Sequence, residues 1–421
     1  MSVFEVSAIL IVLTAILSFI NARFIRLPTM IGVMFLSLIP SLALAITGGA
    51  AWGIKPYAAR LLAHVDFNQA LLHGMLAFLL FAGSLKIDLE DLRSEWDAIT
   101  ILSLIGTALS TFAIGGGIWL LLRWTRGEMP FIPCLLFGAL ISPTDPVSVL
   151  GILKSAGAPR SIETLMAGES LFNDGVGVVF FFVLLEMAVG GRAPTVGGVA
   201  GMLAWEAGGG VVLGLVGGFI TYELIRRVDN YQVEVLLTLA LTMGGYALGD
   251  AIGVSGPLAM VVAGLFIGNR GRAFGMSNAT RAHLDTFWEL IDETLNAVLF
   301  MLIGLEVLVM PFRPAYVLAG AAAIALSLAA RWVSVETLVR LLRLRRDFCP
   351  GTVPVLTWGG LRGGLSVAMA LSLPPSRYRD RILAITYCVV VFSVLVQGLT
   401  IGMVTRRVCG VDLRRSGAIP E

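Results

Sequence analysis

Apolar runs long enough to cross a lipid bilayer follow one another along almost the whole chain. A membrane-spanning helix needs about 20 mostly apolar residues, and about thirteen segments meet that requirement. Of the 421 residues, 57% are hydrophobic and only 14% are charged, whereas soluble domains carry about 25% charged residues. The sequence therefore predicts an all-α polytopic membrane protein that lies in a lipid bilayer. The segments are 3–22, 28–48, 67–85, 98–121, 130–153, 161–189, 196–225, 233–249, 255–268, 285–310, 315–338, 353–373 and 382–405.

Composition narrows the function classes. The formal net charge is only +2, so no strongly basic surface suggests a nucleic-acid partner. Three histidines and four cysteines are too few and too scattered for a metal centre, and the cysteines are typical of small apolar packing residues. We therefore expect no nucleic-acid partner and no cofactor. The cysteines are Cys134, Cys349, Cys388 and Cys409.

The distribution of lysine and arginine predicts the orientation. If the N-terminus is outside, the loops that face the cytoplasm carry most of the basic residues, as the positive-inside rule requires. We therefore expect an outside N-terminus and a cytoplasmic C-terminus with a short tail at 406–421. A bacterial-type inner (plasma) membrane is the expected location.

Two interrupted helices occupy matching positions in the two halves of the chain. If the first six and the last six segments are repeats, the linker helix 196–225 between them places the repeats in opposite orientations. The fifth segment of each repeat is broken, by S-P-T-D-P within 130–153 and by W-G-G-L-R-G-G within 353–373. Inverted repeats with matching interrupted helices indicate the binding site of a secondary transporter.

The first interruption supplies oxygen atoms. Proline cannot donate a helical hydrogen bond, so Pro143 and Pro146 each leave a carbonyl without its usual donor. Backbone of this kind is tolerated at membrane depth only where it is buried in protein or lines a cavity. Thr144 and Asp145 lie at this point, and hard oxygen ligands suit a small cation. The alternative is a proline kink in which Asp145 only caps the following helix.

The next segment contains G-E-S-L-F-N-D-G. Residues four apart lie on one helix face, so Glu169 and Asn173 form one column while Ser170 and Asp174 form another. Carboxylates inside a membrane are costly and usually functional. We expect one column to face a structural partner and the other to face the ion cavity. The alternative is that both carboxylates are neutralised structural groups.

Two arginines of the second half supply positive charge. Arg331 has no acidic neighbour in its own segment and a buried guanidinium needs a carboxylate, so we predict a structural pair with Glu169. Arg362 lies among the glycines of the second interruption, where it can neutralise the ends of the half-helices. The two arginines would offset two of three carboxylates and leave one net negative charge for a monovalent cation.

A further acidic group begins the segment 285–310. Glu289, Asp292 and Glu293 follow one another closely at its polar start. We expect them to mark a water-exposed helix end or an interhelical contact rather than a transport site.

The motifs resemble those of a known family. S-P-T-D-P-V, G-E-S-L-F-N-D-G, S-G-P-L-A-M-V-V-A-G-L-F-I-G-N, F-W-E-L-I-D-E-T-L-N, the arginine of segment 315–338 and W-G-G-L-R-G are similar, in order, to the monovalent cation/proton antiporter superfamily. The likeness is strongest to its sodium/proton exchanger branch, of the NhaP and NHE type. It implies a homodimer and thirteen helices in two inverted repeats.

The resemblance also implies two bundles and roles for the site residues. A dimerisation bundle would span 1–85 and 233–310, and an ion-binding core would span 98–189 and 315–405. Asp174 would carry sodium or a proton. Asp145, Ser170 and the backbone of Thr144 would complete a sodium site, with Glu169 acting through water.

Asn173 bears on the stoichiometry. The electrogenic branch of the family has a second aspartate at this position, so the asparagine implies electroneutral exchange of one cation for one proton. The mechanism requires only that sodium and a proton compete for Asp174 during alternating access.

Rival readings remain open. A potassium/proton or broader monovalent cation/proton antiporter would use the same oxygen ligands, with lithium also possible. A sodium-coupled carrier of organic anions would need room and polar anchors for a larger solute. An intramembrane aspartyl protease is disfavoured because the chain offers only A-L-G-D around Asp250, and a channel is disfavoured because nothing suggests a continuous ring-lined pore. We expect no enzyme activity.

Overall fold

The structure is a computed structural model that describes residues 3–46, 74–124, 129–145, 147–190, 196–308 and 314–410. Within these ranges the chain is helical, and the only β-type pairing is an isolated bridge between Asp145 and Leu361. Pro146, part of the predicted segments 28–48 and 67–85, and the predicted tail beyond residue 410 lie outside the described residues.

The helices follow the predicted apolar runs, with short breaks and the π-helical turns η1, η4 and η5. The first half contains α1 (Val3–Ile20), η1 (Asn21–Ile25), α2 (Thr29–Ile46), α4 (Leu76–Leu85), α5 (Leu89–Ser94), α6 (Trp96–Trp124), α7 (Phe131–Ile141), α8 (Val147–Ala156), α9 (Arg160–Gly190) and α10 (Val196–Ile225). The second half contains α11 (Tyr231–Ile252), α12 (Gly256–Phe266), η4 (Ile267–Gly271), α13 (Arg272–Gly275), α14 (Asn278–Glu306), α15 (Pro314–Leu342), α16 (Thr352–Trp358), α17 (Gly364–Leu371), α18 (Arg379–Phe392), η5 (Ser393–Gln397) and α19 (Gly398–Val408).

Seven helices among the described residues are long and apolar enough to cross a membrane. Three shorter apolar helices fall in α2, α4 and α7. The interrupted segments are divided into the short helices α7, α8, α16 and α17, none of which can cross alone. The fold is that of a polytopic helical protein, while the count of about thirteen spans stays a prediction.

Both predicted interruptions are present. The first separates α7 from α8 and the second separates α16 from α17. The two breaks meet, because the backbone N–H of Asp145 donates a 2.8 Å hydrogen bond to the carbonyl of Leu361. Two stretches of open backbone from opposite halves of the chain therefore satisfy part of each other's hydrogen-bonding capacity in the interior.

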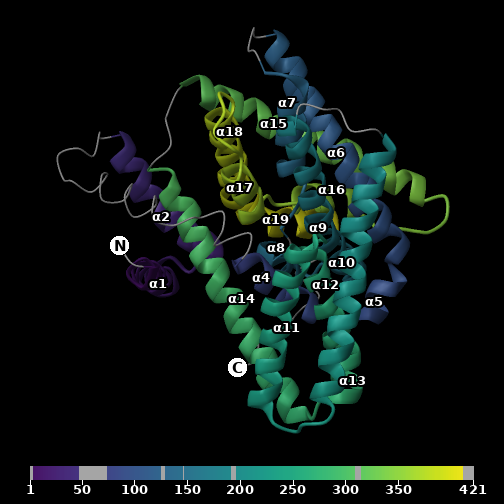
Figure 1. The fold of residues 1–421 in the computed structure, drawn as a ribbon. Helices are drawn as coiled ribbons and strands as arrows, with labels where there is room; N and C mark the ends of the chain where they lie inside the picture. The colour runs from purple at the N-terminus through teal and green to yellow at the C-terminus, as the bar shows by residue number, and fades with distance from the viewer. Residues whose placement is uncertain are drawn as a thin grey trace.

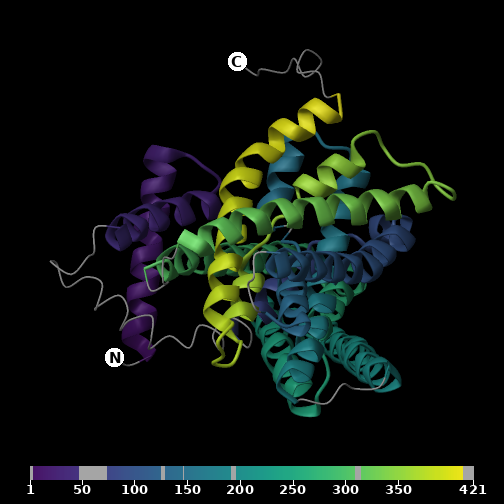
Figure 2. The ribbon, with the colours of Figure 1, turned by 90° about the horizontal axis from the view of Figure 1, so that it is seen from above.

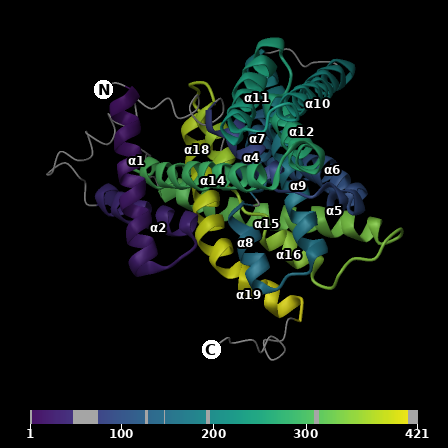
Figure 3. The same cartoon turned by 90° about the horizontal axis from the view of Figure 1, so that it is seen from below.

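The arrangement surrounds this crossing with long helices. Figure 1 places α8, α9, α16 and α19 near the middle of the molecule. Figure 2, seen from above, shows the purple α1 and α2 on one side and the teal helices α10 to α12 on another. In Figure 3, α14 runs from the side of α1 and α2 towards α9, and α14 packs against both α2 and α4.

Two helix starts and one turn depend on local signals. The side chain of Asn230 caps α11 and that of Ser277 caps α14, so α14 begins at Asn278 instead of near residue 285. Gly253 ends α11 with a φ of 69°, a left-handed conformation that glycine adopts without steric cost. This turn separates α11 from α12, which correspond to the predicted segments 233–249 and 255–268.

Candidate cation-binding site

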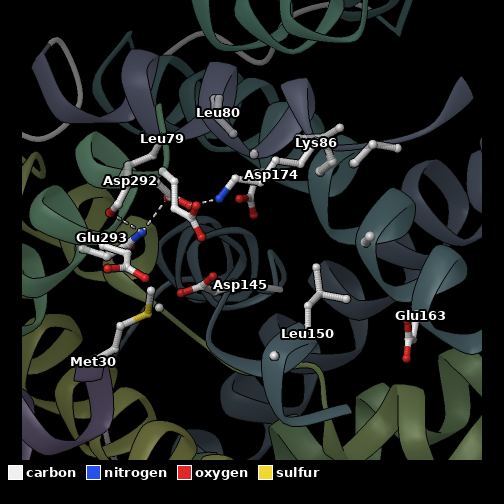
Figure 4. A pocket seen from close by; sticks show the side chains of 18 of the residues that line it. Met30, Leu79, Leu80, Lys86, Asp145, Leu150, Glu163, Asp174, Asp292 and Glu293 are labelled. Carbon is white, nitrogen blue, oxygen red and sulfur yellow. Dashed lines mark hydrogen bonds and ion pairs between the residues drawn. The ribbon is translucent and has the colours of Figure 1, made fainter. Parts of the chain in front are cut away.

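A cavity of about 1000 Å³ reaches the point where the broken helices cross. Its wall includes Asp145 from the first break and Asp174 from α9, and both residues are partly exposed. Figure 4 shows the two carboxyl groups in the cavity wall, with Asp292 and Glu293 of α14 nearby. The structure thus brings together the two aspartates that the sequence singled out, although they lie 29 positions apart in the chain.

The first break is held by polar side chains of α9. Asn173 accepts a hydrogen bond from the Thr144 N–H at 3.2 Å and donates one to the Thr144 hydroxyl at 2.8 Å. The hydroxyls of Thr144 and Ser170 lie 2.9 Å apart. All three residues are buried, with exposed fractions of 1% or less, so α9 fixes the open backbone just before Asp145.

The second break contributes a positive charge to the first. The Arg362 guanidinium donates hydrogen bonds to the carbonyls of Ser142 at 2.9 Å and Pro143 at 3.0 Å. These carbonyls follow the C-terminus of α7, where the helix dipole places partial negative charge. The buried guanidinium therefore faces carbonyls that have no helical donor.

Glycines allow this close approach. A Cβ atom at Gly363 would lie 2.6 Å from an Asp145 carboxyl oxygen, and one at Gly360 would lie 3.1 Å from Cγ2 of Thr144. Atoms cannot approach a Cβ that closely without displacement. The glycines of W-G-G-L-R-G-G therefore let the second break touch the first.

Glu169 lies in a closed ion pair with Arg331 of α15. Two parallel hydrogen bonds of 2.6 and 2.5 Å join the guanidinium to the carboxylate, and their residues are only 4% and 1% exposed. Asn173 donates a third hydrogen bond to the carboxylate at 3.1 Å. The guanidinium also donates to the carbonyl of Leu356 in α16, so the pair joins α9, α15 and α16.

The predicted sodium ligands divide into two groups. Asp145 and Asp174 line the cavity, whereas Thr144 and Ser170 lie behind them and contact each other. Glu169 and Asn173 are likewise absent from the cavity wall. A cation at the crossing would meet the two aspartates, and the Ser170 hydroxyl oxygen keeps a lone pair beside its hydrogen bond with Thr144 that can also coordinate a cation.

Lys86 is a cavity residue that the sequence reasoning missed. Its ammonium group lies 3.3 Å from a carboxyl oxygen of Asp292, and Asn296 donates to the other oxygen at 2.8 Å. Of the two roles expected for Asp292, the structure shows an interhelical contact, between α4 and α14. The spacing of Glu289, Asp292, Glu293 and Asn296 on one face of a helix was the available signal.

Basic residues in or beside the loops also line the cavity. Lys86, Lys154, Arg160 and Arg272 all belong to its wall. Each lies in or beside a connection that the lysine and arginine distribution predicts to be cytoplasmic. The cavity therefore joins the crossing point to the predicted cytoplasmic side.

Comparison with known proteins agrees with this architecture. The sequence model described as "Sodium/hydrogen exchanger, transmembrane" matches residues 9–407. The chain is 48% identical to the Na(+)/H(+) antiporter NhaP of Pseudomonas aeruginosa over 98% of this chain and 99% of the relative. It is 37% identical to the Na(+)/H(+) antiporter NhaH of Halobacillus dabanensis, over 80% and 82%.

A solved structure shares the fold. The sodium proton antiporter MjNhaP1 of Methanocaldococcus jannaschii superposes with a TM-score of 0.73 and 20% sequence identity, covering 97% of this chain and all of the other. The family model spans nearly the whole chain and the relatives are matched over most of their own length. The chain is an integral membrane protein that belongs to the sodium/hydrogen exchanger family.

Proposed function

We propose that the chain is a secondary active sodium/proton antiporter that works by alternating access, with electroneutral exchange of one sodium ion for one proton. One observation carries the proposal: Asp145 and Asp174 share a cavity at the crossing of two broken helices. The two relatives compared above are named as sodium/proton antiporters, and the family consists of transporters. Enzyme activity is therefore not expected.

Competition at Asp174 provides the coupling. A carboxylate in a partly dehydrated site can be neutralised by a proton or by a cation, and each excludes the other. Asp145 assists as the second carboxylate at the crossing, and the Ser170 side chain and the Thr144 backbone act as additional sodium ligands. If the protein changes orientation only when the site is neutralised, sodium and proton gradients drive each other.

The charges around the site support an electroneutral cycle. Arg331 offsets Glu169 through direct contact, and Arg362 brings its positive charge to the carbonyls of Ser142 and Pro143 in the first break. The carboxylates of Glu169, Asp145 and Asp174 then keep one uncompensated negative charge, which can hold a monovalent ion. The uncharged Asn173 supports the same count, because it holds Thr144 and Glu169 without adding charge.

The cavity supports an inward-facing state. It reaches basic residues of the predicted cytoplasmic loops, which fits an outside N-terminus and a cytoplasmic C-terminus in the inner membrane. In the proposed cycle the core bundle (98–189 and 315–405) moves against the dimerisation bundle (1–85 and 233–310) of a homodimer. The cavity lies between α8 and α9 of the core and α4 and α14 of the dimerisation bundle, where such a movement would close it.

A potassium/proton antiporter is the nearest alternative, because carboxylate and hydroxyl oxygens serve several monovalent cations. A sodium-coupled carrier of organic anions is disfavoured by the cavity wall. Nine acidic residues of that wall outnumber its four basic residues, and the excess of negative charge repels an anionic solute.

The test is a cation panel in proteoliposomes that contain a pH-sensitive dye. Sodium should drive proton movement in the unmodified protein, and a potassium-diffusion potential should not change the rate. Proton movement with potassium alone would replace the proposal by the alternative, and a rate that follows the imposed potential would refute electroneutrality.

A further inference from the structure

Ser393 and Gln397 are two buried polar residues in an apolar helix. They lie in the stretch V-V-F-S-V-L-V-Q-G-L, between α18 and α19, and are only 0% and 4% exposed. Burying a polar group costs free energy unless it forms hydrogen bonds. Neither residue has a part in the exchange mechanism described above.

Both side chains bind the open backbone of the second crossing helix. The Arg362 N–H donates a 2.8 Å hydrogen bond to the Ser393 hydroxyl, and the Gln397 amide donates one of 2.9 Å to the carbonyl of Trp358. Trp358 is the last residue of α16, and Arg362 lies just before α17. The two side chains thus replace helical partners that these backbone groups lack.

The local helix geometry presents both groups to the same break. Ser393 and Gln397 are the first and last residues of the π-helical turn η5. Residues four apart share a helix face, and π-helical turns inside α-helices occur frequently at functional sites. Ser393 and Gln397, four residues apart on this turn, therefore reach Arg362 and Trp358, which are four residues apart across the break.

The held segment is the one that contacts the candidate site. The side chain of Arg362 binds the carbonyls of Ser142 and Pro143, and the carbonyl of Leu361 accepts the N–H of Asp145. A shift of the backbone at residues 361 and 362 would therefore move both the positive charge and the backbone of Asp145.

We propose that Ser393 and Gln397 are positioning residues for cation exchange. They fix the backbone of the second break, and through Leu361 and Arg362 they set the geometry of Asp145 opposite Asp174. This inference rests on the proposed function, because it assigns these residues a role in the affinity of the same site.

The test is the sodium dependence of exchange in proteoliposomes, normalised to the amount of folded protein. Ser393→Ala and Gln397→Leu each remove one buried hydrogen bond, so the apparent KM for sodium should rise about tenfold. Ser393→Thr keeps the hydroxyl and should stay near the unmodified KM. Ser393→Cys, a weaker hydrogen-bond acceptor, should fall between Thr and Ala.

Thr405→Val is the matched control on the same helix. Thr405 is fully buried and its hydroxyl donates only to Ile401 within α19, so this variant should lower stability without a change in KM. Unchanged KM values in the Ser393 and Gln397 variants would overturn the inference and leave a structural role only. If Ser393→Ala does not fold, the comparison of Ser393→Cys with Ser393→Thr decides the same question.

The two failures are distinguishable. Absence of sodium-driven proton movement in the unmodified protein would refute the proposed function. Normal exchange in the unmodified protein, with variants that match its KM, would refute the positioning role alone.

Discussion

Glu169 and Asp174 are carboxylates on the same helix in opposite environments. Glu169 is 1% exposed and receives two hydrogen bonds from Arg331 and one from Asn173. Asp174 is partly exposed and lines the cavity together with Asp145. The same chemical group is therefore enclosed by partners at one position and open to an arriving ion at the other.

This difference separates two roles that residue type alone does not distinguish. A buried carboxylate with a matched guanidinium cannot lose its charge without leaving the partner uncompensated, which is strongly unfavourable. A carboxylate on a cavity wall can exchange a proton for a cation, because water and ions reach it. We therefore expect substitutions at Asp174 to affect transport first and substitutions at the ion pair to affect stability first.

Asp174→Asn tests the transport half of the comparison and should have the largest effect. The amide keeps the shape of the side chain, but it has no negative charge to bind sodium and cannot take up or release the exchanged proton. Sodium-driven proton movement in proteoliposomes should be abolished, while the thermal unfolding temperature stays near that of the unmodified protein. Substantial remaining exchange would show that Asp174 is not the carboxylate that exchanges sodium for a proton.

Asp145→Asn should be nearly as severe. It removes the carboxylate that lies beside Asp174 at the crossing but leaves the backbone N–H that binds Leu361, so the crossing itself should persist. We expect a large rise in the apparent KM for sodium and a much reduced rate, measured in the same liposomes. An unchanged KM would mean that Asp145 only caps α8.

Arg331→Ala tests whether the ion pair with Glu169 stabilises the fold. The substitution leaves the Glu169 carboxylate buried without its partner, which should cost about 3–5 kcal/mol and lower the unfolding temperature as well as the rate. The double variant Glu169→Met with Arg331→Met removes both charges and should recover most of that stability. If Arg331→Ala were as stable as the unmodified protein, Glu169 would not be a structural tie.

Asn173→Asp should have the smallest effect of the four. The new carboxylate would lose the two hydrogen bonds donated to Thr144 and Glu169 and would face Glu169 directly. We expect a loss of about 1–3 kcal/mol in stability, measured by thermal unfolding at neutral pH and largely relieved at acid pH. The outcome that contradicts this expectation is equal stability at both pH values.

Much of the fold could be predicted because its signals are local. The clustered prolines of S-P-T-D-P and the clustered glycines of W-G-G-L-R-G-G weaken a helix locally, so both breaks could be placed from the sequence. The pairing of Arg331 with Glu169 could be proposed because each charge lacks a local partner, and the structure places the two groups in contact.

The remaining contacts depend on tertiary packing. The Lys86–Asp292 ion pair joins residues 206 positions apart, and nothing in the local pattern selects that partner. Ser393 and Gln397 resemble ordinary polar residues of an apolar helix until the neighbouring open backbone is known. The pair of hydrogen bonds between Asn173 and Thr144 likewise requires the position of the first break relative to α9.

Competition between sodium and a proton at Asp174 can be measured as the number of protons released when sodium binds to the purified protein. Calorimetric titration in buffers of different ionisation enthalpy measures this number without a membrane gradient. Competition at Asp174 predicts release of about one proton per sodium ion from the unmodified protein at acid pH, and none from Asp174→Asn. Equal proton release from both proteins would show that sodium and the proton do not compete at Asp174.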